Sequence, residues 1–384
     1  MTVHDIYAHS ERQLHNFIDN KILDYTDLRN YDFGPNQPAK VSQLSPYISH
    51  RVLLEYDIVK EILAKHPLPK TEKYIQEVFW RIYWKGWLEL RPNVWTDFVK
   101  ESSVGNQNQA YLDAINARTD IDFFNAWVIE LKEYNYLHNH TRMWFASIWI
   151  FTLKLPWQLG ASFFLKNLYD GDPASNTLSW RWVAGLQTKG KNYLATKSNI
   201  EKYSNITVGR IDLINNAVPL SEAYQYPIQS LSHNPKSRSR YSNLLIFETE
   251  LNQQHLKVDY AGYENIFVLL LGNNKRKITL SEKVLTFKRD LVKSFQITFK
   301  TPQIINTKFI ENYCQSGKKL DVIYPFVGEN LDYLIELQST FKTSLNMIFR
   351  NNDIYCWQFA NKGYFNFKKN IADILKQILQ DGTR

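Results

Sequence analysis

The chain has 384 residues, a formal net charge of +8 and a sequence pI of about 9.1. Its length suggests two or three domains with a large core, and its basic balance is compatible with binding a polyanion. The two cysteines, Cys314 and Cys356, are too few for a disulfide framework or a four-cysteine iron–sulfur cluster within this chain. The N-terminus, MTVHDIYAHSERQ, lacks an apolar signal region, so we expect a cytoplasmic protein.

The first segment, residues 1–30, has the pattern of a helix with charged faces followed by a link. The glycine and prolines of FGPNQPAK, at 33–40, then predict a loop, and SQLSPYI follows at 42–48. The hydroxyls of Ser42 and Ser45 suit a phosphate near a helix start. On these residues alone, a plain Ser-Pro helix cap is the better explanation.

A helical face is predicted around residue 80, because Glu77, Trp80, Arg81 and Trp84 recur at i, i+3, i+4 and i+7. A surface Glu–Arg pair beside two core aromatic side chains is the simplest interpretation of this face. Residues 91–125 are expected to contain a loop, RPNVW, then a polar stretch rich in Asn and Gln, and then a helix.

A long apolar run begins at Met143 and continues to Leu165, which approaches the roughly 20 residues of a membrane span. Polar and helix-breaking residues interrupt it after Leu153, so we expect a buried helix, a short break and a second helix. Asn139 and Arg142 share a face at the mouth of the first helix. His138 and His140 lie beside them, but two histidines without a nearby third ligand do not predict a metal site.

The turn Asp170-Gly171-Asp172-Pro173 predicts a helix start, with Asp172 as the N-cap and Pro173 in the first position. On this helix Asn176 and Trp180 share a face, whereas Trp180 and Trp182 point in different directions. From composition alone, a capped core helix with two packing tryptophans has the better odds. Alternatively, the two carboxylates accept hydrogen bonds from a polar ligand edge.

A linker is predicted at 215–242 by its Pro, Ser and Asn content. Beyond it, short apolar runs alternate with helical segments, which indicates a parallel α/β sheet. The expected strands lie in NLLIFET, NIFVLLLG, KLDVIYPFV and SLNMIFRN, and the expected helices in SEKVLTFKRDLVKSF, NLDYLIELQSTF and, last, NFKKNIADILKQIL. No glycine-rich nucleotide loop accompanies them.

Five segments occur in an order and spacing that resemble the flavin-binding helical domain of the DNA photolyase and cryptochrome family. They are SQLSPYI, EVFWRIYW at 77–84, LHNHTRM at 137–143, DGDPASN at 170–176 and WRWVAGLQT at 180–188. The resemblance covers the chain from about Asn30 to Arg210. It implies an all-α FAD-binding domain at 1–214, followed by the linker and by a smaller Rossmann-like α/β domain at 243–384.

The family usually has an α/β antenna domain before its flavin domain, and this chain leaves no room for one there. We therefore interpret residues 243–384 as an antenna-type domain in permuted order. Whether it holds a second chromophore is left open by the sequence, and a structural role is the simpler interpretation.

The resemblance implies that FAD is the cofactor, held between helices in a U shape. The loop at 41–45 departs from the family, since Val41 replaces its Thr and Gln43 its Arg, so that one phosphate contact is absent. The residues implied to contact FAD or to lie near it are Tyr31, Ser42, Leu44, Ser45, Arg81, Asn139, Arg142, Asp170, Asp172 and Asn176.

The resemblance also implies a substrate pocket, in which Trp80 and Trp182 form the walls and Glu77 holds the substrate edge. Asn139 would bond to the substrate, Met143 would pack against it, and Asn176 would approach the flavin N5. Met143 stands where photolyases specific for (6-4) products commonly have His, which points to cyclobutane pyrimidine dimers.

Electron transfer to the flavin runs along three tryptophans in the family. Trp157 and Trp180 match two of them. No tryptophan occurs near 98–104, where the third is expected, and Trp95 is out of register.

The function implied by the resemblance is blue-light-driven repair of cyclobutane pyrimidine dimers by electron donation from reduced FAD. Its partner would be damaged DNA rather than a membrane, and the protein would be a monomer. The alternative is a cryptochrome-like photoreceptor that binds FAD without repair. The retained pocket residues favour repair, whereas the missing tryptophan and the unusual domain order favour some divergence.

Overall fold

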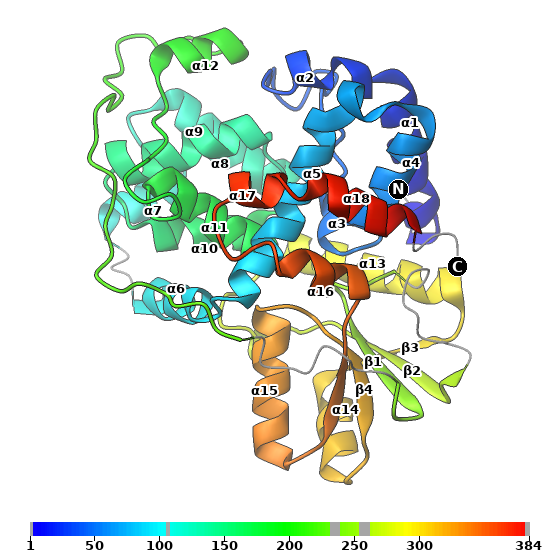
Figure 1. The fold of residues 1–384 in the computed structure, drawn as a ribbon. Coiled ribbons are helices and arrows are strands. Elements are labelled where there is room, and N and C mark those ends of the chain that lie inside the picture. The colour runs from blue at the N-terminus through cyan, green and yellow to red at the C-terminus, as the bar shows by residue number, and fades with distance from the viewer. Residues whose placement is uncertain (1–2, 105–107, 231–238, 253–261, 381–384) are drawn as a thin grey trace.

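The structure is a computed structural model of the chain, and it describes residues 3–104, 108–230, 239–252 and 262–380. Helices make up the first part, a parallel sheet follows, and the last helices return to the first part (Figure 1). We call residues 3–230 the helical region. Its helices are η1 (Val3–Asp5), α1 (Ile6–Asn20), η2 (Ile22–Asp24), α2 (Tyr25–Leu28), α3 (Ser45–Ser49), α4 (Glu55–Lys65), α5 (Leu68–Glu89), α6 (Asn93–Val104), α7 (Gln109–Ile115), α8 (Asp122–Tyr134), α9 (Asn139–Ser147), η3 (Ile148–Thr152), α10 (Trp157–Asn167), α11 (Pro173–Ala184) and α12 (Lys197–Tyr203).

The long apolar run forms the expected pair of buried helices with a break between them. Helix α9 continues into a π-helical turn, η3, and the chain then breaks at Lys154, where φ is 54°, before α10 begins. Phe145 and Trp149 have no exposed surface. Within the described residues, no helix is both long enough and apolar enough to cross a membrane.

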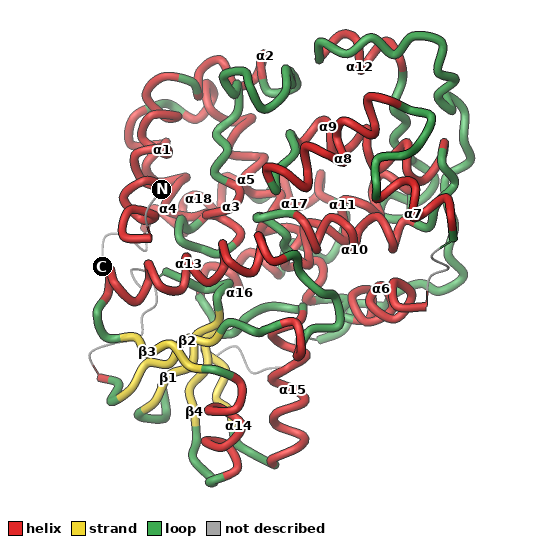
Figure 2. The backbone as a smooth tube through the Cα atoms, turned by 180° about the vertical axis from the view of Figure 1, so that it is seen from behind, coloured by secondary structure: helices red, strands yellow, loops and turns green. Residues whose placement is uncertain are grey.

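The second part contains five parallel strands in the order β3-β2-β1-β4-β5. Four of them, β1, β2, β4 and β5, lie within the four apolar runs expected from the sequence, and parallel strands buried on both faces read as such runs. The strands are β1 (Asn243–Phe247), β2 (Asn265–Leu269), β3 (Pro302–Ile305), β4 (Leu320–Ile323) and β5 (Leu345–Ile348). Figure 2 shows them as one sheet below the helical region.

The end of the chain differs from the sequence-based prediction, which was a single helix over 366–379. The structure divides that segment into α17 and α18, with a break at Lys369 and Asn370. The helices after β2 are η5 (Asn273–Lys275), α13 (Glu282–Phe299), α14 (Thr307–Gln315), α15 (Glu329–Phe341), α16 (Asn351–Trp357), α17 (Tyr364–Lys368) and α18 (Ile371–Gln380).

The last three helices leave the sheet and pack on the helical region. Helices α16 and α17 lie against α5, and α18 lies against α4 and α16. Gly86 of α5 permits this close approach, because a Cβ at Gly86 would lie only 2.6 Å from the Trp357 side chain. The two ends of the chain are therefore joined through one continuous core.

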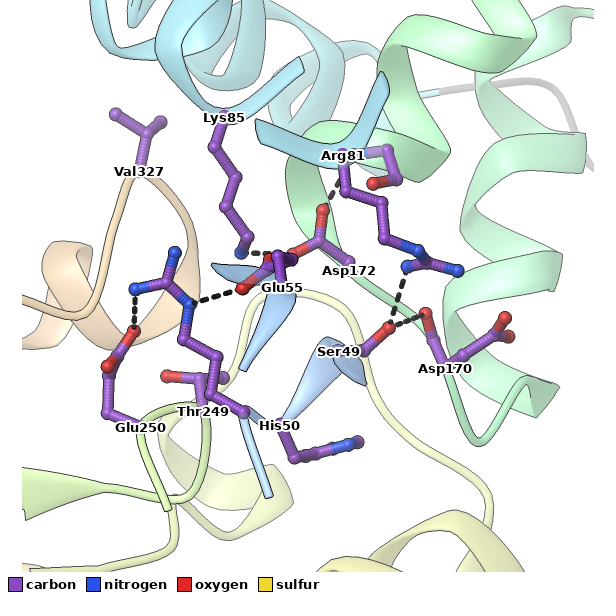
Figure 3. Close-up of polar contacts among 12 residues, drawn as sticks. Ser49, His50, Glu55, Arg81, Lys85, Asp170, Asp172, Thr249, Glu250 and Val327 are labelled. Carbon is purple, nitrogen blue, oxygen red and sulfur yellow. Dashed lines mark hydrogen bonds and ion pairs between the residues drawn. The ribbon is translucent and has the colours of Figure 1, made fainter. Parts of the chain in front are cut away.

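A buried group of charged residues joins the helical region to the carboxyl edge of the sheet. We call Arg51, Glu55, Glu250, Arg350 and Asp353 the interdomain ion cluster. Arg51 donates two hydrogen bonds to Asp353, of 2.7 and 2.8 Å, and its Nη1 lies 3.2 Å from Glu250 Oε1. Arg350 donates to the other oxygen of Glu250 at 3.0 and 3.1 Å. Arg51 Nε also lies 3.3 Å from Glu55 Oε2, and Figure 3 labels Glu55 and Glu250 of this cluster.

Candidate cofactor and substrate site

A cavity of about 650 Å³ lies in the helical region, between α3, α5, α9 and α11. That volume falls within the range of about 300–1,000 Å³ that is common for ligand sites. The expected site residues on it come from four separate stretches of the chain. The expected site residues that line it are Ser42, Leu44, Ser45, Glu77, Trp80, Arg81, Asn139, Arg142, Met143, Asp170, Asn176, Trp180 and Trp182.

Three expected site residues lie outside the cavity lining. Tyr31 packs edge-on against Tyr203, with their ring centroids 5.2 Å apart. Asp172 points away from the cavity to Lys85, and Trp157 stacks on Phe98.

An ion pair between Arg142 and Asp170 forms one side of the cavity, with Nη1 and Oδ2 3.0 Å apart. Helix α9 orients Arg142, whose Nε also donates to the carbonyl of Leu137. Burial raises the pKa of Asp170, but the guanidinium groups of Arg142 and Arg81 outweigh that effect and lower the pKa below its usual value. Asp170 therefore presents a fixed negative charge to the cavity.

Arg81 faces Asp170 across Ser49. Its Nη1 donates to Ser49 Oγ at 3.2 Å, and Ser49 Oγ donates to the carbonyl of Asp170 at 3.2 Å, as Figure 3 shows. Helix α5 therefore carries Arg81 toward the turn before α11. No sequence pattern pointed to Ser49, because a serine inside a short apolar helix is ordinary.

Asp172 begins α11 as expected from the Asp-Pro pair. Its Oδ1 accepts from the Ser175 N–H at 2.7 Å, and its Oδ2 lies 2.8 Å from Lys85 Nζ (Figure 3). Burial raises the pKa of Asp172, yet the ammonium group of Lys85 and these hydrogen bonds lower it to about 2. Asp172 is thus an ionised N-cap that fixes the start of α11, and Asn176 lies on the cavity one turn later.

Asn176 and Trp180 lie on the cavity side of α11. The Asn176 amide donates to the carbonyl of Ala161 at 2.9 Å, which leaves its carbonyl oxygen for a ligand. Trp180 packs against Gly160 of α10, where a Cβ would meet the indole at 2.3 Å. These contacts hold both side chains on the cavity wall.

The loop before α3 places two hydroxyl groups on the cavity. Ser42 Oγ accepts a hydrogen bond from Tyr74 OH at 3.1 Å, and Gln43 adopts a left-handed conformation with φ 53°. Burial raises the pKa of Tyr74 to about 12, so its hydroxyl stays protonated and able to donate. Leu44 and Ser45 follow and also line the cavity.

The expected substrate end of the cavity lies beside α5. Trp80 stacks on Tyr364 of α17, with ring centroids 3.5 Å apart and an interplanar angle of 12°. Trp182 stacks on Tyr193 at 5.7 Å. Glu77 forms an ion pair with Lys73 at 3.1 Å, and both side chains are about one-third exposed. Tyr364 could not be anticipated from the sequence, because it lies 284 residues from Trp80.

Aromatic side chains other than a third tryptophan lie next to Trp157. Phe98 stacks on Trp157 at 5.6 Å, and Trp95 lies 5.6 Å beyond Phe98. Trp95 is buried, and its indole N–H donates to Asp332 at 3.1 Å. The prediction of a loop at RPNVW is wrong in part, because α6 begins at Asn93 and includes Trp95.

The two histidines near the cavity have separate structural contacts. His138 is the N-cap of α9, and its ring accepts from the His140 N–H at 3.2 Å. His140 stacks on Trp144, with ring centroids 4.3 Å apart. No group of three potential metal ligands among His, Cys, Asp and Glu occurs in the part of the chain that the structure describes.

Comparison with known proteins finds relatives of the region that includes most of the cavity. Residues 74–239 match the family described as "FAD binding domain of DNA photolyase". A deoxyribodipyrimidine photo-lyase of Vibrio cholerae is 26% identical over 192 residues, which are 47% of this chain and 40% of that protein. One of Streptomyces griseus is 30% identical over 165 residues, or 42% of this chain and 36% of that protein.

Two solved structures are also similar. A bacterial class III photolyase from Agrobacterium tumefaciens has a TM-score of 0.44 and 24% identity, and the match covers 51% of this chain and 42% of the photolyase. A cryptochrome of Synechocystis has a TM-score of 0.46 and 20% identity, with 51% and 43% of the two chains covered.

The helical region therefore has the features of a cofactor-binding domain. A parallel α/β sheet follows it in the chain. Residues 74–239 are similar to the FAD-binding domain of DNA photolyases. The chain spans about two fifths of the length of the curated relatives that it matches.

The residues of the cavity fit FAD. Aromatic rings at Trp80 and Trp182 and the indole of Trp180 provide apolar walls for planar ring systems. Arg81 and the Arg142–Asp170 pair provide fixed donors and acceptors, and the Ser42 loop provides hydroxyl groups. This combination of mostly apolar walls with a few oriented polar groups is typical of cofactor sites.

Proposed function

We propose that the protein is a light-driven DNA repair enzyme that splits cyclobutane pyrimidine dimers with FAD as its cofactor. One observation carries the proposal: the candidate flavin contacts Arg81, Arg142 and Asp170 line the same cavity as the candidate substrate contacts Glu77 and Trp182. Electron transfer between two ligands is favoured by short distance, and one shared cavity provides that. The photo-lyases among the curated relatives support the same activity.

In this proposal the chain's own residues bind and orient the pyrimidine dimer. Enzymes that act on bases take them out of the duplex, and photolyases are among the standard examples of such base flipping. Trp80 and Trp182 stack on the extruded dimer, Glu77 and Asn139 bond to its polar edge, and Met143 packs against it. FAD supplies the light absorption and the electron.

Asp170, Arg142 and Arg81 hold the flavin end in the proposed arrangement, and Asn176 offers its free carbonyl oxygen there. Met143 supports cyclobutane dimers as the substrate, since its side chain is apolar and offers no proton. We also propose that residues 1–214 and 243–384 are two domains joined by 215–242, with α16–α18 of the second packed on the first. We propose further that residues 243–384 are an antenna-type domain in permuted order, and that the protein is a cytoplasmic monomer.

The experiment is repair of an oligonucleotide with one thymine dimer by the purified, pre-reduced protein under blue light. A dark reaction is the control. Loss of dimer only in the light is the expected result. Bound flavin without any repair would contradict the proposal.

A cryptochrome-like photoreceptor is the second candidate. The contact of Trp157 with Phe98 favours it, because the usual tryptophan chain is altered there. Light-induced changes in the flavin spectrum without dimer loss would support this second candidate.

A further inference from the structure

Helix α17 packs on α5 and forms a rim beside Trp80, a candidate substrate residue that lines the cavity. Tyr364, its first residue, stacks on Trp80 at 3.5 Å and also contacts Tyr83 at 5.4 Å. Burial, followed by the negative charges of Glu77 and Glu72, raises the pKa of Tyr364. Figure 1 shows α17 lying across α5.

Hydrogen bonds fix this rim to the helical region. Tyr83 OH donates to the carbonyl of Lys362 at 2.9 Å, and Arg91 Nη2 donates to the carbonyl of Asn361 at 2.8 Å. Tyr364 OH donates to the carbonyl of Gln76 at 2.7 Å. The turn before α17 and its first residue are therefore held in place before any ligand binds, which lowers the entropic cost of binding.

The outer side of the rim combines a phenyl ring with positive charge. Phe365 is 80% exposed, and its ring centroid lies 6.5 Å from that of Tyr364. Lys362 and Lys369 are exposed, and neither forms an ion pair within the described residues. This part of the surface therefore offers both an aromatic face for stacking and positive charge.

We propose that Lys362, Phe365 and Lys369, which we call the α17 rim, bind the DNA duplex beside an extruded pyrimidine dimer. This inference rests on the proposed function. The lysines contact the phosphates, and the phenyl ring stacks on the base exposed where the dimer leaves the helix. Aromatic rings stack on any base, and lysines contact phosphates without regard to sequence.

The two parts of the rim make different predictions. Phe365 acts only where a base is unstacked, so it contributes to the preference for damaged over undamaged DNA. Lys362 and Lys369 contribute equally to both, and their contribution falls as salt increases because binding releases counterions.

The experiment measures the affinity of the full-length, FAD-loaded protein for a duplex with one thymine dimer and for the same undamaged duplex. Fluorescence anisotropy in the dark, at several salt concentrations, gives both values. We expect Phe365→Ala to weaken binding to the damaged duplex about ten-fold and to leave undamaged binding unchanged. Phe365→Trp should retain the preference.

The charge variant is the double substitution Lys362→Gln with Lys369→Gln. We expect it to weaken both complexes by the same factor and to reduce the slope of log K against log salt by about 2. The matched control is Lys308→Gln with Lys318→Gln, at exposed positions by α14, outside the helical region. The control should leave the slope unchanged.

The outcomes separate this inference from the proposed function. If the wild type prefers the damaged duplex and Phe365→Ala keeps the full preference, the inferred role of the α17 rim is wrong and the proposed function stands. If the wild type shows no preference, both are wrong. Thermal unfolding and flavin absorbance of each variant establish that the fold is unchanged, as expected for a ring that is 80% exposed.

Discussion

The cavity and the carboxyl edge of the sheet both bury charged side chains, but the two regions use them differently. Around the cavity, Asp170 is paired with Arg142, and space of about 650 Å³ remains beside them. At the sheet edge, Arg51 is surrounded by the carboxylates of Glu55, Glu250 and Asp353, and their side chains fill the space between the two parts.

The difference separates buried charge that serves a ligand from buried charge that serves the fold. In open α/β sheets ligands usually bind at the carboxyl ends of the strands, where the strand order reverses. Here that position lies between β1 and β4. The residues that follow these strands, Glu250 and Val327, instead contact Arg51 and Glu89 of the helical region. Within the described residues, this part of the edge joins the two parts of the chain.

The largest expected effect comes from breaking the interdomain ion cluster. Asp353→Asn removes the charge that faces Arg51 and leaves that buried guanidinium next to two weaker partners. Removing one partner of a buried ion pair costs about 3–5 kcal/mol, and the lower end of that range applies here because Glu55 and Glu250 still face Arg51. Urea unfolding should show a loss of that size in the free energy of unfolding.

A matched exposed pair provides the control for Asp353→Asn. Lys65 and Asp19 are 2.7 Å apart but 46% and 48% exposed. Lys65→Met should change the free energy of unfolding by less than about 1 kcal/mol. Similar losses in the free energy of unfolding for the two variants would show that the interdomain ion cluster stabilises the protein no more than an exposed ion pair does.

The next effect is a pH dependence at the same joint. Glu89 of α5 accepts hydrogen bonds from Tyr324 OH at 2.7 Å and from Val327 N at 2.8 Å. Burial raises the pKa of Glu89 from 4.5 to about 7 in spite of these bonds. Because the folded state holds the proton more tightly, the contribution of Glu89 is fully present below about pH 4.5 and is lost as the pH rises through about 7.

Glu89→Gln keeps the neutral form at every pH. Between pH 4.5 and 7.5, the free energy of unfolding of the wild type should fall relative to this variant by about 3 kcal/mol. Thermal or urea unfolding at several pH values measures the difference. Parallel curves for the two proteins would contradict the shifted pKa.

A smaller effect is expected on the substrate side of the cavity. Glu77→Ala should leave flavin bound and reduce repair at low DNA concentration about 10–100-fold, since a hydrogen bond to a charged group contributes about 1.5–3 kcal/mol. Glu61→Ala, a partly exposed glutamate of α4 that does not line the cavity, is the control. Loss of flavin in Glu77→Ala would mean that Glu77 is structural.

The smallest effect concerns the hydroxyl of Tyr364, where the two ends of the chain meet. Tyr364→Phe keeps the ring on Trp80 but removes the hydrogen bond to the carbonyl of Gln76. The free energy of unfolding should fall by about 1 kcal/mol. Dimer binding should be unchanged, and a large loss of binding would show that the hydroxyl itself contacts the substrate.

Local sequence patterns predicted those parts of the structure that depend on neighbouring residues. The Asp-Pro pair predicted the start of α11 at Asp172, and apolar runs predicted β1, β2, β4 and β5. The edge strand β3 was not predicted, because Pro302–Ile305 is short and half of its residues are exposed. The prediction of one final helix failed at Lys369 and Asn370, where helical periodicity continues across a break.

Contacts between distant segments could not be predicted in the same way. Arg51 and Asp353 are 302 residues apart, and an isolated arginine and aspartate carry no sign of pairing. Asp172 has a carboxylate suited to a ligand, yet the structure directs it to Lys85. Pairing of this kind depends on how α5, α11 and the sheet pack together, which no local pattern encodes.

The most direct test of the contrast between the two regions is a titration of the protein with FAD, followed by flavin absorbance after removal of free FAD. We predict one flavin per chain for the wild type and for folded Asp353→Asn, because the ion cluster serves the fold. Ala146→Phe, which extends a larger side chain from the cavity lining, should lose the flavin while remaining folded. Flavin retained by Ala146→Phe but lost from folded Asp353→Asn would contradict this assignment of the two regions.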